Sequence, residues 1–208
     1  MLLADKLSKY RVILASNSPR RQELIKDLNI PFIIKTKEIE ELYPEHLKGA
    51  EISDFLATLK AIPFEKELLE NDLLITSDTI VWHQNKALGK PKDYQDAFEM
   101  LQSFSDTTHQ VITSICISIV GVSDVSKTST KQPKKIIFND TTTVTFKKLT
   151  HDEVDYYINT YKPFDKAGAY GIQEWIGKIA ITKIEGSYFN VMGFPVHKLY
   201  QELMNINE

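Results

Sequence analysis

The chain has 208 residues, of which 42% are hydrophobic and 25% charged, a composition typical of a globular protein with a sizeable core. Its net charge of −3 and pI near 6.0 exclude a general attraction for nucleic acid or acidic membranes, so any anion site must be local. No apolar stretch is as long as a membrane span, which needs about 18 residues, and no signal peptide is recognised. We therefore expect a cytoplasmic protein. The lone cysteine, Cys116, excludes an intrachain disulfide and is expected to be a small buried hydrophobe.

An apolar strand near the N-terminus leads into a helix that is predicted to begin at Pro19. Ser18 is a good N-cap, and proline suits the first helical position. Arg20 and Arg21 then stand in the first turn, where the helix dipole disfavours cations unless an anion joins them. The helix start therefore predicts a phosphate site where backbone N–H groups and guanidinium groups converge. The alternative is that both arginines are solvated or paired with a local acid such as Glu23.

Strands and helices alternate along the rest of the chain, as judged from apolar spacing and from runs of β-branched residues. Further helices are predicted over residues 50–61, 93–105, 151–161 and 194–204. Strands are predicted over residues 73–82, 109–121, 136–149 and around 178–184. A polar hairpin loop is expected at about 123–135. The pattern predicts one domain over 1–208, with an α/β fold, a central mixed twisted sheet and helices on its faces.

Asp78 is a charged residue inside the apolar strand predicted over 73–82. An uncompensated carboxylate facing the core would be strongly destabilising, so Asp78 is expected to face either a polar site or the solvent. Its neighbours Ser77 and Thr79 favour the polar site. Because an aspartate is ionised at neutral pH, it can orient a water or hold a divalent cation beside a polyphosphate.

Further charged residues could serve the same site, although each is also consistent with a solvated surface. An acidic run supplies oxygen ligands for a metal at Glu38, Glu40 and Glu41. Lysines that stand near predicted turns and could neutralise phosphate are Lys60, Lys90 and Lys166. The histidines show no metal-ligand spacing and a single cysteine excludes a thiolate zinc site, which leaves a hard cation bound by oxygen.

The segment DKAGAYGIQ, residues 165–173, combines small residues with an amide. Gln173 offers both a donor and an acceptor, as reading the edge of a nucleobase requires. The same segment is equally consistent with a packed structural turn.

Seven segments stand in the order SNSPRRQELI, SDTIV, LGKP, HQVITS, TVTF, DKAGAYGIQ and EGSYFNVMGFP. The first resembles the SxSPRR signature of the Maf family of nucleotide pyrophosphatases, which are related to the inosine triphosphate pyrophosphatases, and the others follow in the family's order. The resemblance covers nearly the whole chain. It implies an elongated α/β molecule with two lobes around a cleft, commonly a homodimer.

The resemblance also implies a reaction and its residues. Water attacks the α-phosphorus of a nucleoside triphosphate with the help of Mg²⁺ or Mn²⁺, and the products are the monophosphate and pyrophosphate. Asp78 matches the family's proton acceptor and is expected, with Glu41, to hold the metal. Glu41, Lys60 and Lys90 match other catalytic groups of the family. The residues expected to bind substrate are Ser16, Ser18, Arg20, Arg21, Thr79, Lys166 and Gln173. Among them Arg21, Thr79 and Gln173 resemble the branch that hydrolyses dTTP and UTP.

The sequence also departs from the family's pattern. Lys162 stands where many members have Glu, and Glu174 and Trp175 follow Gln173 where Gly is usual. The first change could remove an acid from the cleft, and the second could alter the wall beside the base. Two alternatives stay open. One is a nucleotide-sensing regulator of cell division or septum formation, since the family is associated with these processes. The other is the same chemistry on modified purine triphosphates, which the loss of the Gly after Gln173 keeps open.

Overall fold

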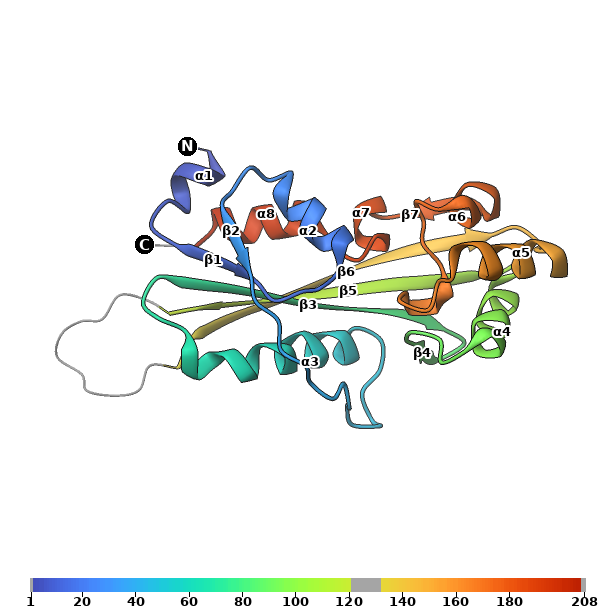
Figure 1. The fold of residues 1–208 in the computed structure, drawn as a ribbon, viewed down its shortest axis with the longest axis horizontal. Coiled ribbons are helices and arrows are strands. Elements are labelled where there is room, and N and C mark those ends of the chain that lie inside the picture. The colour runs from blue at the N-terminus through green and yellow to red at the C-terminus, as the bar shows by residue number, and fades with distance from the viewer. Residues whose placement is uncertain (1, 121–131, 207–208) are drawn as a thin grey trace.

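A mixed sheet forms the centre of the elongated molecule in the computed structural model, which describes residues 2–120 and 132–206 (Figure 1). Its strands are β1 (Arg11–Leu14), β2 (Phe32–Ile34), β3 (Asp72–His83), β4 (Lys86–Leu88), β5 (Thr108–Ile119), β6 (Lys134–Phe146) and β7 (Ile181–Glu185). Their order across the sheet is β2-β1-β3-β5-β6-β7, and β4 pairs with β3. β1 runs parallel to β2 and β3, whereas the other pairings are antiparallel. The predicted mixed α/β architecture is confirmed.

Helices lie on both faces of this sheet. They are α1 (Leu3–Lys6), α2 (Pro19–Lys26), α3 (Ala50–Ala61), α4 (Tyr94–Phe104), α5 (His151–Tyr161), α6 (Trp175–Ala180), α7 (Tyr188–Val191) and α8 (Val196–Met204). Two short 3₁₀ helices are η1 (Ile62–Glu67) and η2 (Ala167–Ala169). In Figure 1, α3 lies on one side of the long strands, and α2 and α8 lie on the other. Helices α4, α5 and α6 gather at the far end of the sheet.

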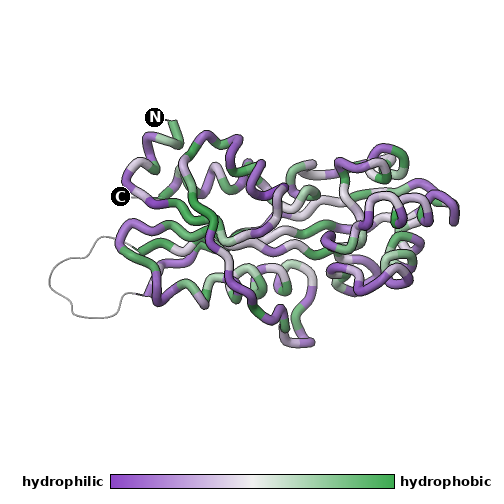
Figure 2. Tube along the Cα trace, in the orientation of Figure 1, coloured by the Kyte–Doolittle hydropathy of each residue, from purple (hydrophilic) through white to green (hydrophobic). Residues whose placement is uncertain are grey.

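The alternation of side chains along β3 divides the core between these helices. Leu73 and Ile75 join the apolar cluster under α1, α2 and α8, whereas Leu74 joins Cys116 under α3. A further cluster at the other end includes Phe104 and Tyr157, from α4 and α5. Figure 2 shows the hydrophobic stretches along the strands and the hydrophilic stretches on the outer turns. The long strands thus connect two packed ends, and Cys116 is buried as predicted.

Local signals account for the helix starts. Ser18 caps α2 through a hydrogen bond from the backbone N–H of Arg21, and Pro19 takes the first helical position. Thr150 and Glu153 form the capping box of α5, with hydrogen bonds of 2.9 and 3.2 Å. Both starts lie where the sequence predicts them.

Several segments differ from the sequence prediction. Lys178 to Ala180 belong to helix α6 rather than to a strand, because Ile176 and Ala180 point into the core at helical spacing and β7 begins only at Ile181. Strands β2 and β4 and helices α1 and α7 are not predicted at all. The expected loop at 123–135 lies mostly outside the described residues, and its last two residues, Lys134 and Lys135, already belong to β6.

Along residues 2–120 and 132–206, none of the helices combines the length and the apolar character that a membrane crossing needs.

Candidate active site

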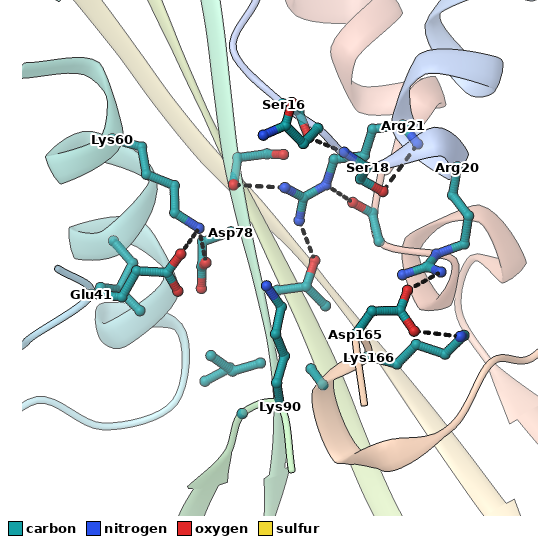
Figure 3. A pocket seen from close by; sticks show the side chains of 18 of the residues that line it. Ser16, Ser18, Arg20, Arg21, Glu41, Lys60, Asp78, Lys90, Asp165 and Lys166 are labelled. Atoms are coloured by element: carbon teal, nitrogen blue, oxygen red, sulfur yellow. Dashed lines mark hydrogen bonds and ion pairs between the residues drawn. The ribbon is translucent and has the colours of Figure 1, made fainter. Parts of the chain in front are cut away.

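A cleft of about 760 Å³ opens beside β3, at the point where β1 ends. The last residue of β1, Leu14, pairs with Ile75 of β3. Along the same edge of β3, the next pairing in the described chain joins Val81 to Leu88 of β4. Between these pairs the edge of β3 faces the cleft. Helix α2 and helix α3 form two walls, and the loop that leads into η2 forms another (Figure 3). Sites for anions and nucleotides gather where neighbouring strands diverge in this way.

Asp78 lies in this open stretch of β3 and faces α3. Thr76, two residues earlier, donates to the carbonyl of Ala57 in α3 at 2.7 Å, and alternation places Asp78 on the same side. Lys60 of α3 contacts two carboxylates there, with its Nζ 2.6 Å from Oδ1 of Asp78 and 3.0 Å from Oε1 of Glu41. The Asp78 side chain is only 7% exposed. The alternative of a solvated strand face is therefore excluded for Asp78, and three predicted site residues meet at one point.

Arg21 projects from α2 to the opposite face of β3. Its Nε donates to the carbonyl of Gly193 at 2.9 Å, its Nη1 to the carbonyl of Ser77 at 2.9 Å, and its Nη2 to Oγ1 of Thr79 at 3.0 Å. Burial lowers the pKa of the Arg21 guanidinium, although the charge of Asp78 opposes that effect. Thus Arg21 and Thr79, two of the predicted specificity residues, are hydrogen-bonded to each other. Arg21 is engaged mainly with the protein, which differs from the expected convergence of both arginines on phosphate.

Arg20 points into the cleft from the first turn of α2 and meets the loop before η2. Its Nη1 lies 3.3 Å from Oδ2 of Asp165, whose other oxygen lies 2.7 Å from Nζ of Lys166. Burial disfavours ionisation of Asp165, but the hydrogen bond and charge of Lys166, with the charge of Arg20, outweigh it and hold the pKa of Asp165 below its usual range. A carboxylate of the protein, Asp165, is therefore paired with two of the cations that are expected to bind phosphate.

The remaining predicted residues also line the cleft, except Glu40 of the acidic run, which is exposed and lies outside the lining. Oγ of Ser16 accepts from the backbone N–H of Ser18 at 3.2 Å, which shapes the turn before α2. Lys90 extends toward the space between Asp78 and Arg21 (Figure 3), and no acceptor among the described residues contacts its ammonium. Oε1 of Gln173 is buried and has no hydrogen-bond partner in the same part of the chain. The cleft lining thus includes a lysine ammonium and a buried amide oxygen that have no partner within the described residues.

The family model described as Maf-like protein matches residues 11–206. The chain belongs to the Maf family. It is similar to a protein named dTTP/UTP pyrophosphatase from Flavobacterium johnsoniae, at 56% identity over 99% of this chain and 100% of that protein. A protein of the same name from Flavobacterium psychrophilum is 54% identical over 98% of each chain. The solved structure of the Staphylococcus aureus Ham1 protein covers 92% of this chain and 99% of that one, at 15% identity and a TM-score of 0.47.

Asp78 and Glu41 provide the carboxylates with which this Maf-family chain could hold a metal. Residues 2–120 and 132–206 contain no group of three or more His, Cys, Asp or Glu side chains arranged around a metal position. The two carboxylates nevertheless converge on one cation, the Lys60 ammonium. Magnesium is commonly held by one or two carboxylates while water and substrate phosphates complete its shell. The donors therefore fit a hard divalent cation that binds together with a phosphate chain.

Of the three positions where the sequence departs from the family, Lys162 lies away from the cleft, Glu174 lies behind its wall, and Trp175 begins α6 outside the cleft lining. Lys162 ends α5 in a left-handed conformation with φ 47°, and its side chain is exposed outside the cleft lining. It therefore does not alter the cleft, contrary to expectation. Glu174 contacts Lys166, with Oε1 3.1 Å from Nζ. Sequence reasoning missed the pairing of Asp165 with Arg20, and the only signal available was its place next to Lys166 in DKAGAYGIQ.

Proposed function

We propose that this Maf-family chain is a nucleoside triphosphate pyrophosphatase that converts dTTP and UTP to the monophosphate and pyrophosphate. The observation that carries the proposal is Asp78, a nearly buried carboxylate held by Lys60 at the edge of a cleft that also contains Arg20, Lys90 and Lys166. The names of the two Flavobacterium relatives support the choice of dTTP and UTP.

The charges around the cleft suit a triphosphate. Arg20 and the N-terminal turn of α2 offer guanidinium and backbone N–H donors, a combination that favours phosphate. Lys90 adds a cation without a competing acceptor in the described chain. Since the protein as a whole is acidic, this concentration of positive charge is local. It supports a small polyanionic ligand rather than a nucleic acid.

Asp78 is proposed to accept the proton of the attacking water. As the water oxygen bonds to the α-phosphorus, the bond from that phosphorus to the bridging oxygen breaks, and pyrophosphate leaves with the bond's electron pair. Lys60 orients the Asp78 carboxylate through its 2.6 Å contact, and Lys90 neutralises charge on the leaving group. A divalent cation held by Asp78 and Glu41 supplies electrostatic stabilisation of the phosphate charge when bound.

Gln173 is proposed to read the base. Thymine and uracil share an edge with an N–H between two carbonyl groups, which a carboxamide can match with one acceptor and one donor. The buried, unpartnered Oε1 of Gln173 supports this role, because a buried acceptor without a partner is costly until a ligand supplies one. Thr79 and Arg21, joined at 3.0 Å, are proposed to hold the neighbouring wall in place.

Isotope transfer from water tests the site of attack. The protein is incubated with dTTP and a divalent metal in ¹⁸O-labelled water, and the products are analysed by mass spectrometry. Attack on the α-phosphorus places the label in the monophosphate. Label in pyrophosphate indicates attack on the β-phosphorus, and release of inorganic phosphate indicates cleavage at the γ-phosphorus; either result contradicts the proposed reaction.

The location proposed for this reaction is the cytoplasm. Cys116 is a free, buried thiol, which suits a reducing compartment.

A further inference from the structure

Lys166 is a nearly buried lysine whose side chain is only 8% exposed. Its Nζ lies 2.7 Å from Oδ1 of Asp165 and 3.1 Å from Oε1 of Glu174. A buried ammonium needs such partners, because its desolvation is otherwise strongly unfavourable. The two carboxylates, however, stand on different sides of the lysine.

Asp165 lines the cleft and is 59% exposed, and it also contacts Arg20. A phosphate chain that binds Arg20 and Lys166 must therefore compete with it. Glu174 lies outside the cleft lining and is 19% exposed. When a phosphate displaces Asp165, Glu174 is the carboxylate that stays with Lys166.

The Glu174 carboxylate is held in place by Tyr157 and by the loop at Gly171. The hydroxyl of Tyr157, a fully buried residue of α5, donates to Oε2 of Glu174 and accepts from the backbone N–H of Gly171 at 3.1 Å. A Cβ at Gly171 would lie 2.9 Å from the Glu174 carboxyl carbon, so the loop passes directly over this side chain. A rigid carboxylate thus holds the end of a flexible lysine, which reduces the ordering that substrate binding requires.

We propose that Glu174 is a positioning residue that holds the Lys166 ammonium in place for the phosphates of the substrate. This inference rests on the proposed function. Because Glu174 acts through Lys166, it affects substrate binding and leaves the proton transfer at Asp78 unchanged.

A double-mutant cycle tests this role. Glu174→Gln keeps an oxygen that can accept from Tyr157 but removes the charge beside Lys166, so KM for dTTP is expected to rise about tenfold while kcat changes less than about twofold. In a Lys166→Met background the same substitution is expected to change KM less than about twofold. Glu185→Gln is the matched control, since Glu185 forms an exposed pair with Lys183 at 3.0 Å.

A second variant, Glu174→Asp, and the Kd of pyrophosphate distinguish a positioning role of Glu174 from a general loss of folding. Glu174→Asp keeps the charge on a shorter side chain and is expected to give a smaller rise in KM, and it replaces Glu174→Gln if that variant does not fold. The Kd of inorganic pyrophosphate, measured by calorimetry on every variant, is expected to follow KM. A wild-type KM and Kd in Glu174→Gln, or an equal effect with and without Lys166, overturns the inference. If the wild-type protein releases no pyrophosphate, the proposed function fails, and the pyrophosphate Kd still tests Glu174.

Discussion

The ammonium of Lys60 lies 2.6 Å from Oδ1 of Asp78, across the gap between α3 and β3. A charge-assisted hydrogen bond at this distance fixes the direction of the carboxylate. Within the described residues, no hydrogen bond engages the other oxygen, Oδ2, and it faces a cleft lined by cations. One oxygen is thus used for orientation, and the other can accept a proton.

Replacing Asp78 with Asn tests whether Asp78 accepts the proton of the attacking water. The amide keeps the shape of the side chain but is not a base, so kcat is expected to fall by about a hundredfold or more, the scale of lost acid–base catalysis. Nucleotide binding is expected to persist, as measured by calorimetry. Asp152→Asn, at an exposed position of α5, is the matched control. Wild-type turnover in Asp78→Asn would remove Asp78 from the mechanism.

Arg21 and Arg20 are adjacent but differ in environment, so lysine is expected to affect them differently. Arg21→Lys loses the fork that contacts Gly193, Ser77 and Thr79, and the free energy of unfolding is expected to fall by about 2–4 kcal/mol. Arg20→Lys loses one 3.3 Å contact with Asp165 and should cost less than about 1 kcal/mol. Urea unfolding measures both variants. A loss below about 1 kcal/mol in Arg21→Lys would show that the buried fork of Arg21 contributes little to stability.

Asp165 competes with phosphate for Arg20 and Lys166. Asp165→Asn removes this competition, so inorganic pyrophosphate is expected to bind about three- to tenfold more tightly. The gain should shrink as salt is added, because it is electrostatic. Calorimetric titration at low and high salt checks both statements. Weaker binding in Asp165→Asn would mean that the carboxylate organises the two cations instead of competing for them.

His109 makes the fold sensitive to acid. Its Nε2 lies 2.8 Å from the hydroxyl of Tyr170, and burial, with a smaller effect of the charge of His83, lowers the pKa of His109 to about 3. In the unfolded chain His109 binds a proton below about pH 6.5, whereas in the folded chain it stays neutral until about pH 3. Protonation of His109 therefore lowers the free energy of unfolding as the pH falls. Between about pH 7 and about pH 5 the loss is about 2 kcal/mol.

The comparison of wild-type protein with His109→Gln isolates this loss from other titrating groups. Urea unfolding at both pH values is expected to show a fall in stability that is about 2 kcal/mol larger in the wild type than in the variant. His151→Gln, at an exposed histidine, should behave as wild type. The same pH dependence in wild type and His109→Gln would exclude a depressed pKa at His109.

The sequence predicts correctly where a helix begins when neighbouring residues determine that start. The start of α2 follows from Ser18 and Pro19, and that of α5 follows from Thr150 and Glu153, because each cap is made within three or four residues. The segment at 178–180 is different. Its alternating apolar residues resemble a strand, but packing of Ile176 and Ala180 into the core selects a helix.

Contacts between distant segments explain what the sequence could not predict. Arg21 belongs to a sequence motif typical of phosphate binding, yet it contacts Gly193, which is 172 positions away. No residue near Arg21 in the sequence predicts that contact. The pairing of Asp165 with Arg20 likewise spans 145 positions. Motif order predicts which residues line the cleft, whereas the direction of each side chain depends on how the strands bring the segments together.

Pyrophosphate release from a panel of nucleotides tests the proposed pyrophosphatase activity and its preference for dTTP and UTP. Purified protein is incubated with Mg²⁺ or Mn²⁺ and with dTTP, UTP, CTP, GTP, ITP or methylated GTP, and the Asp78→Asn variant is measured alongside. Pyrophosphate release is expected to favour dTTP and UTP and to be lost in Asp78→Asn. Nucleotide binding without pyrophosphate release from any of the six would contradict the proposed activity and favour a nucleotide-sensing protein.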